Sequence, residues 1–307
     1  MSREILLATF LSPCRSYCSG WRSIGANIGK WSALGVRGWA GFLASLLLLT
    51  VWGTAFGLND GHSADSVLIA VTEFTGTSTI LHLYRWTFEV QEVWSTLVPG
   101  IPAFVALIDV SHSGAPEIIA GVHLPGSRSS VLIYGECNDG YELMYNDTSI
   151  GSIALARPYL IDYYGNGSEY LLVPGRGSLL IGWEAEGPVA KGGSPFSMGY
   201  MGFACGDVNG FGRPDIVHHR SGGFAVLENK GGGEYLERSL GGNTPSVIDE
   251  IKIGDVDGDG ANEIVMVGCC PPNPSLSVWK CVEGEYEEVW SYFGGTIQSV
   301  DIGDMDG

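Results

Sequence analysis

The stretch from residue 254 to residue 267 contains a loop that few folds can accommodate. Acidic residues stand at its first, third, fifth and ninth positions, namely Asp255, Asp257, Asp259 and Glu263. Calcium takes about six to eight oxygen ligands, and carboxylates at alternate positions of a glycine-containing loop can supply them. We therefore expect these four side chains and the Ala261 carbonyl to bind Ca2+. A short β-branched run follows, which predicts a strand and excludes the helix of an EF-hand.

The loop recurs in weaker form along the chain. The first aspartates of the copies are about 45 to 53 residues apart, a period typical of propeller blades or a solenoid. They are Asp109, Asp162, Asp207, Asp255 and Asp304. Most copies replace one or more acids, so we treat them as weak or degenerate metal loops. Their candidate ligands are Asp109, Glu117, Asp207, Asn209, Asp215, Asp304 and Asp306.

A second pattern recurs between the loops: an apolar strand, a polar turn and another strand. It covers residues 81–94, 131–145, 225–237 and 277–290. Adding the strand after each loop and the strand before the next gives four strands per repeat, as in a propeller blade. The fold class we predict is all-β: a β-propeller of four-stranded antiparallel blades with about five repeats, preceded by one N-terminal hydrophobic helix.

From residue 59 to residue 307 the chain resembles the FG-GAP/VCBS class of repeats, found in integrin α-chain propellers and in many secreted or surface proteins of microbes. The motif Asp-x-Asp-x-Asp-Gly-x-x-Asp/Glu followed by Ile-Val is satisfied in full from Asp255 to Val265. The resemblance implies calcium-binding propeller repeats at a cell surface.

The number of repeats leaves the closure of the propeller open. About five modules fit after residue 59, the last strand is expected near Ile297–Ile302, and Asp304 opens another loop. Because propellers avoid exposed edges by closing, we expect this sequence to be part of a longer chain. A five-bladed ring is the alternative.

A different kind of sequence precedes the repeats. Residues 39–58 carry no charged side chain, and 20 residues are enough to cross a bilayer. Residues 1–38 form a short basic segment, whereas the repeat region is strongly acidic in a chain of net charge −18. Positive charge before an apolar span keeps that flank in the cytoplasm and directs the repeats outward. The span is an anchor, a cleaved signal peptide or a buried core helix, so we expect a membrane-bound or secreted repeat domain.

The cysteines leave a second question open. Cys269 or Cys270 could form a disulfide with Cys281 across neighbouring strands in an oxidising compartment, and free core cysteines are the alternative.

The sequence contains no catalytic signature such as Gly-x-Ser-x-Gly, His-Glu-x-x-His or a phosphate loop. The acidic balance argues against nucleic acid and anionic lipid as partners. We therefore predict a non-enzymatic binding or adhesion module for a protein or glycan ligand, attached to the membrane through residues 39–58. The alternative is the propeller portion of a secreted polysaccharide-active or other enzyme whose catalytic part lies outside this chain.

Overall fold

The computed structural model describes residues 67–302 apart from 88, 127, 139, 149, 154–155, 194–201, 221, 243, 270–271 and 298. Within this part of the chain every regular element is a β-strand. None of the described residues belongs to a helix that is long and apolar enough to cross a membrane. The predicted basic segment 1–38 and the hydrophobic helix 39–58 lie outside the described residues.

The strands form five antiparallel sheets, each made of consecutive strands. The first sheet contains β1 (Val67–Phe74), β2 (Ser78–Trp86) and β3 (Val90–Pro99). The second contains β4 (Ile101–Ile108), β5 (Glu117–Leu124), β6 (Arg128–Cys137) and β7 (Gly140–Asp147). The third contains β8 (Tyr159–Ile161), β9 (Tyr170–Val173), β10 (Leu179–Glu184) and β11 (Gly187–Gly193). The fourth contains β12 (Phe203–Gly206), β13 (Asp215–Arg220), β14 (Gly223–Gly231) and β15 (Glu234–Gly241). The fifth contains β16 (Val247–Gly254), β17 (Glu263–Cys269), β18 (Leu276–Val282) and β19 (Glu285–Tyr292).

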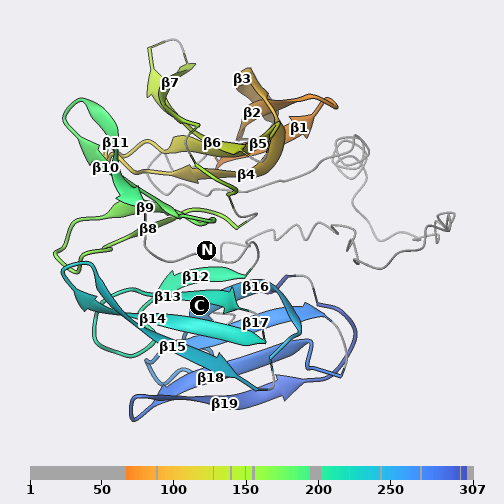
Figure 1. The fold of residues 1–307 in the computed structure, drawn as a ribbon. Coiled ribbons are helices and arrows are strands. Elements are labelled where there is room, and N and C mark those ends of the chain that lie inside the picture. Colours follow the sequence, from red (N-terminus) through yellow and green to blue (C-terminus); the bar gives the residue numbers. More distant parts are fainter. Residues whose placement is uncertain are drawn as a thin grey trace, which may run out of the picture.

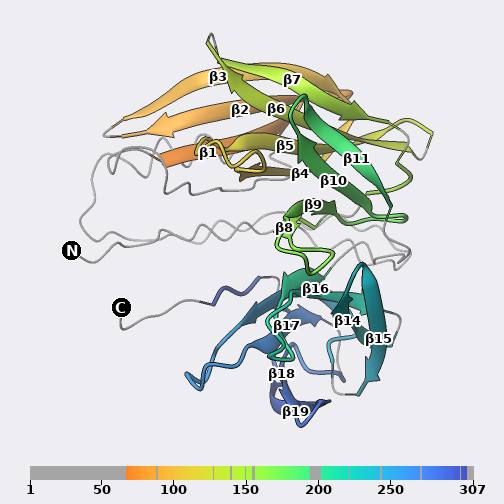
Figure 2. The same cartoon turned by 90° about the vertical axis from the view of Figure 1, so that its left-hand side faces the viewer.

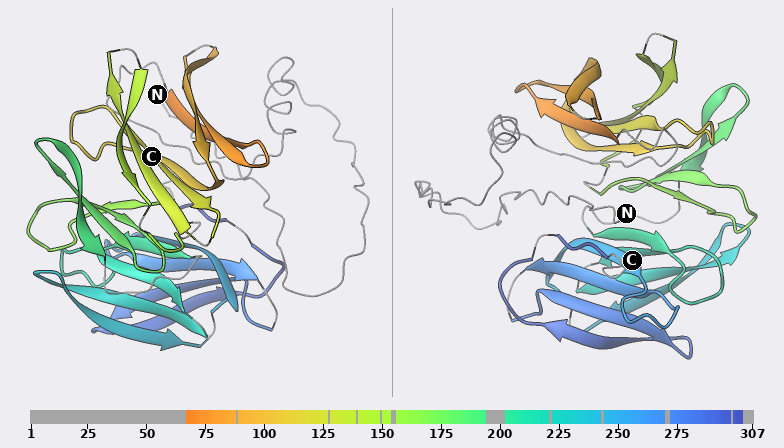
Figure 3. Two further views of the ribbon diagram at one scale, coloured as in Figure 1. Left: turned by 45° about the horizontal axis from the view of Figure 1, so that its top comes forward. Right: turned by 180° about the vertical axis from the view of Figure 1, so that it is seen from behind.

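The five sheets follow one another round an arc, with the first sheet at one end and the fifth at the other (Figure 1). In the two lower sheets, β12 and β16 lie towards the middle of the molecule, whereas β15 and β19 lie outside (Figures 1 and 2). Contacts between β12 and β16, and between β8 and β12, join the inner strands of neighbouring sheets. The described sheets do not close into a ring (Figure 3).

The predicted hairpins are confirmed. Each of the four repeated patterns forms an antiparallel strand pair: β2 with β3, β6 with β7, β14 with β15, and β18 with β19. The strand that follows each of the four described acidic loops is also present, as β5, β9, β13 and β17. These strands are rich in β-branched and large apolar residues, which favour a pleated surface buried on both faces.

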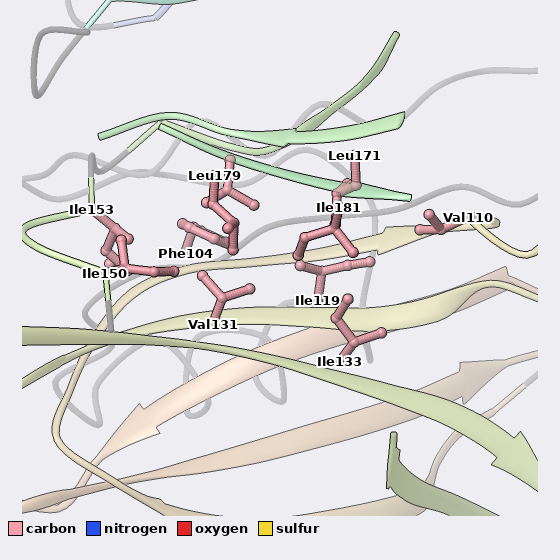
Figure 4. Close-up of a cluster of buried hydrophobic side chains, with 12 residues drawn as sticks. Phe104, Val110, Ile119, Val131, Ile133, Ile150, Ile153, Leu171, Leu179 and Ile181 are labelled. Atoms are coloured by element: carbon pink, nitrogen blue, oxygen red, sulfur yellow. The ribbon is translucent and has the colours of Figure 1, made fainter. Parts of the chain in front are cut away.

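Four clusters of buried side chains hold the arc together, and each cluster is shared by two successive sheets. Between the second and third sheets, for example, Phe104, Ile119 and Ile133 pack against Leu171 and Ile181 (Figure 4). Large side chains that are removed from water in this way dominate the stability of such a domain. The core is therefore a series of inter-sheet layers.

The structure corrects the sequence prediction in two places. Among the described residues the first sheet has three strands where four were expected. The described residues between Ile297 and Ile302 form no strand, although Val300 N donates a hydrogen bond to Glu250 of β16 at 2.9 Å. A Cβ atom at Gly254 would lie 3.2 Å from Ile302, much as one at Gly206 of β12 would lie 2.8 Å from Ile253 of β16. This segment thus occupies the place of a next inner strand, but it has no described strand to pair with.

The disulfide between Cys281 and Cys269 or Cys270 is not formed, because Cys281 has a free thiol. Cys269 is disulfide-bonded, and its partner lies outside the described residues. Of the two alternatives for Cys281, the structure therefore supports the free thiol.

Candidate metal centre

The acidic loops occupy equivalent places, because each described one connects the first strand of a four-stranded sheet to the second. Their first aspartate has the same task in every copy: its carboxylate accepts hydrogen bonds from backbone N–H groups later in the loop. Asp255 Oδ1 accepts from Gly258 N at 2.7 Å, and Asp255 Oδ2 accepts from Gly260 N at 2.8 Å. Asp109, Asp162 and Asp207 accept equivalent bonds from the fourth, fifth or sixth residue of their own loops. The first aspartate therefore shapes the loop whether or not a metal is present.

The ninth position also has a repeated structural role in three of the loops. Glu263 Oε2 accepts a hydrogen bond from Val256 N at 2.9 Å. Glu117 and Asp215 accept the corresponding bonds from Val110 N and Val208 N. All three acids are buried, with 5% of Glu117 and 1% of Asp215 and Glu263 exposed. Burial is tolerated because backbone donors compensate one carboxylate oxygen.

The second carboxylate oxygen of the ninth residue distinguishes the loops. Glu117 Oε1 accepts a hydrogen bond from the Ser111 hydroxyl at 2.6 Å. Asp215 Oδ1 accepts one from Asn229 N at 2.8 Å. Glu263 Oε1 is buried and faces the Lys280 ammonium, whose Nζ lies 3.0 Å away. Only in this loop of the three does the inner oxygen pair with a cationic group and not with a neutral donor.

Three of the predicted ligands converge in the same loop. One carboxylate oxygen from each of Asp255, Asp257 and Glu263 lies within 4.8 Å of the other two. These are hard oxygen donors, and together with the buried Glu263 Oε1 they fit a hard divalent cation. The predicted fourth acid, Asp259, is not part of this group, and like Asp257 and Glu263 it forms an ion pair with Lys280.

A lysine from the neighbouring strand reaches into this group. Lys280 Nζ lies 2.8 Å from Asp257 Oδ2, 2.6 Å from Asp259 Oδ2 and 3.0 Å from Glu263 Oε1. Hydrogen bonds to Asp257, Asp259 and Glu263 raise the pKa of Lys280 well above its ordinary value. The hydrogen bond from Lys280 in turn lowers the pKa of Asp259. The loop therefore gathers three carboxylates around one ammonium group.

Asparagine side chains connect neighbouring loops. Asn262 Nδ2 donates to the Asp207 carbonyl at 2.8 Å, which joins the Asp255 loop to the Asp207 loop. Asn229 Nδ2 donates to the Asp162 carbonyl at 3.2 Å, which joins the fourth sheet to the third. The loops therefore help to fix the spacing of successive sheets.

Of the weak loops, the structure describes those at Asp109, Asp162 and Asp207. The Asp109 loop uses Ser111 and Ser113 where the strong loop has Asp257 and Asp259, and the Asp207 loop has Asn209 and the exposed Phe211. Asp304 and Asp306 lie outside the described residues. Lys280 was not predicted as part of the site, because its place beside Glu263 depends on the register of β17 with β18.

The chain matches no family model and no curated protein. Several solved structures show a distant likeness. An Agrocybe aegerita lectin that recognises non-reducing terminal N-acetylglucosamine is 15% identical, with 75% of this chain and 67% of that chain covered and a TM-score of 0.44. The Vibrio cholerae biofilm matrix protein Bap1 is 14% identical, with 81% and 44% covered and a TM-score of 0.42. A Lactobacillus plantarum protein is 12% identical, with 79% and 70% covered and a TM-score of 0.49. Similarity at this level carries no argument about function.

Proposed function

We propose that this protein is a calcium-stabilised β-propeller of the FG-GAP/VCBS type that acts outside the cytoplasm as a binding or adhesion module and not as an enzyme. The observation that carries the calcium site is the convergence of one carboxylate oxygen from each of Asp255, Asp257 and Glu263, with Glu263 buried. Hard carboxylate oxygens gathered in this way are the ligands that calcium prefers.

The repeated layer structure supports the propeller. Consecutive antiparallel sheets share buried clusters with their neighbours, and their inner strands contact one another along the arc. This is the radial repetition by which a propeller protects most of its strand edges.

The role of calcium in this proposal is structural. Asp255, Asp257, Asp259 and Glu263 are four like charges within one short loop, and they repel one another unless a cation compensates them. The loop enters β17, a strand whose seven residues are all buried. A calcium ion that holds the loop in one conformation therefore also holds the start of β17 in place.

The binding role follows from the charge and from the proposed location. A chain of net charge −18 repels nucleic acid and anionic lipid, so a protein or a neutral glycan is the ligand class that its surface favours. We place the repeats outside the cell, either secreted or attached to the membrane through residues 39–58.

Two measurements test the proposal on the full chain after removal of metal with a chelator. Calcium should raise the melting temperature and should bind with a stoichiometry that matches the Asp255 loop, as measured by calorimetry. Binding to arrays of immobilised glycans and extracellular proteins should be retained in calcium and reduced in chelator. A melting temperature that does not respond to calcium would overturn the metal site, and hydrolysis of a polysaccharide without retention on it would overturn the binding role.

A further inference from the structure

We propose that the Lys280 ammonium occupies the cation position of the Asp255 loop in the metal-free protein and that a divalent cation binds by displacing it. Lys280 would then set the metal affinity of the loop. The inference rests on the calcium site proposed above and concerns its regulation.

The geometry gives Lys280 the contacts expected of a bound cation. Its Nζ atom lies within 3.0 Å of oxygens from Asp257, Asp259 and Glu263, and its side chain is only 16% exposed. Two of these carboxylates belong to the converging group. A divalent ion and an ammonium group cannot share the same oxygens, because at such short range two positive charges repel strongly.

The position of Lys280 is determined by strand pairing. Trp279 is the Cα partner of Ile264, so Lys280 is the next residue on β18 and stands beside Glu263 of β17. Trp279 is buried in the cluster between the fourth and fifth sheets, which anchors β18 in this register. Lys280 is therefore held at the loop by the sheet and is not a mobile surface lysine that happens to reach it.

The other loops show that a lysine is not a general feature of the repeat. The register places Gly135 at the corresponding position of the second sheet and Glu228 at that of the fourth. In those sheets the inner oxygen of the ninth residue already accepts a hydrogen bond from within the protein. The lysine thus accompanies the one described loop that has acids at all four positions.

A displaced ammonium group has a carboxylate within reach. Glu287 of β19 is the Cα partner of Lys280, and it is exposed. Opposite charges at directly paired positions of an antiparallel sheet attract each other. When a metal binds, the Lys280 ammonium can therefore leave the loop carboxylates and pair with Glu287.

The test compares the full chain with its Lys280→Met variant, each freed of metal. Methionine keeps an unbranched side chain of nearly the same length but removes the charge. Lys252→Met is the matched control, because Lys252 lies in the same sheet, is 21% exposed and pairs with Glu250 at 3.3 Å and Asp301 at 3.6 Å. We expect Lys280→Met to bind calcium at least tenfold more tightly by calorimetry and to melt at a lower temperature in chelator. The control should leave calcium affinity unchanged within about twofold.

Each outcome bears on a different claim. The inference is supported if Lys280→Met binds calcium more strongly than the parent. It is also supported if the variant binds calcium and the parent does not. Equal affinities overturn the inference and leave the calcium site intact. No binding by either protein overturns both the inference and the calcium site.

If the variant does not fold, the rate of lysine acetylation in the parent protein tests the displacement. Lys280 should be acetylated faster in calcium than in chelator, while the rate at Lys252 should not change. An unchanged rate at Lys280 would refute displacement.

Discussion

At the scale of single residues, the acids of the loops have two roles that the sequence does not distinguish. Some form the hydrogen bonds that build the loop, and others can bind a metal. The first and ninth residues form hydrogen bonds that build the loop, and these bonds recur at Asp109 and Asp207 as well as at Asp255. Metal binding needs additional carboxylates and an inner oxygen that no neutral donor of the protein occupies. The inner oxygen of Glu263 pairs with the Lys280 ammonium, whereas that of Asp215 accepts a hydrogen bond from Asn229 N.

Replacing Asp257 with alanine should therefore weaken the response to calcium. The substitution removes one of three converging carboxylates, so we expect about a tenfold loss of calcium affinity and a smaller rise in melting temperature on adding calcium. Asn209→Ala is the matched control, since Asn209 accepts a hydrogen bond from Phe211 N as Asp257 accepts one from Asp259 N. The control should leave the calcium response unchanged. Equal calcium-dependent stabilisation of Asp257→Ala and its parent would contradict the site.

Asp215 should make stability depend on pH in the opposite direction from an ordinary surface carboxylate. Burial raises the pKa of Asp215 to about 6, while hydrogen bonds from Asn229 N and Val208 N oppose the shift. Between the unfolded value of about 4 and this folded value, the folded protein binds the proton more tightly. The contribution of Asp215 is therefore fully present below about pH 4 and is lost as the pH rises through about 6.

The measurement is urea unfolding in chelator from pH 4 to pH 7 for the parent and Asp215→Asn. The variant has no titrating group at this position, so the parent's free energy of unfolding minus the variant's should fall by about 2 kcal/mol across the range. Asp301→Asn, a substitution at an exposed residue, serves as the control. A difference that rises with pH would refute the assigned direction.

At the scale of strands, the outer hairpins of three sheets share a shift in strand register at equivalent positions. The register shifts between Leu83 and Tyr84, between Ile133 and Tyr134, and between Val278 and Trp279. The residues paired just before the shift are aromatic in all three: Trp94, Tyr145 and Trp290. Trp94 and Tyr145 pack against the following sheet, whereas Trp290 is 53% exposed.

Substituting these aligned tryptophans should have unequal effects. Trp94 lies 5.1 Å from the ring of Tyr134 and 5.8 Å from that of Tyr141, so Trp94→Ala should destabilise the first inter-sheet layer by about 3 kcal/mol. Trp290→Ala should change the free energy of unfolding by less than about 0.5 kcal/mol, as surface substitutions commonly do. Urea unfolding of both variants gives the comparison. Equal losses would show that the aligned positions are not packed as described.

At the scale of the whole molecule, stability comes from layers between sheets and not from one central core. Each buried cluster belongs to two neighbouring sheets, so a substitution that destabilises one layer should also destabilise the next sheet through the shared side chains.

Our proposal that the repeats lie outside the cytoplasm rests on the charge difference between residues 1–38 and the acidic repeats.

Protease added to intact cells tests this orientation. We expect it to digest the repeat region and to spare the segment before residue 39, as followed with antibodies to tags at each end. Permeabilised cells provide the control, because both parts are then accessible. Protection of the repeats in intact cells would reverse the proposed topology.

Much of the fold was predictable from local patterns. Alternating apolar residues, polar turns and the acidic loop set the strands, the four hairpins and the repeat length, because side-chain period and turn chemistry act over a few residues. The same locality explains why Asp255, Asp257 and Glu263 could be predicted as a group, since all three lie within one loop.

What the tertiary structure decided depends on register and on neighbours that are distant in sequence. The position of Lys280 among the carboxylates requires the exact pairing of β17 with β18. The three-stranded first sheet and the unpaired segment at Ile297–Ile302 depend on which strands have partners. The sequence by itself thus determined the repeating unit and its acidic loop, whose interactions are local. Only the folded structure determined which lysine pairs with the inner oxygen of Glu263, because that contact joins separate strands.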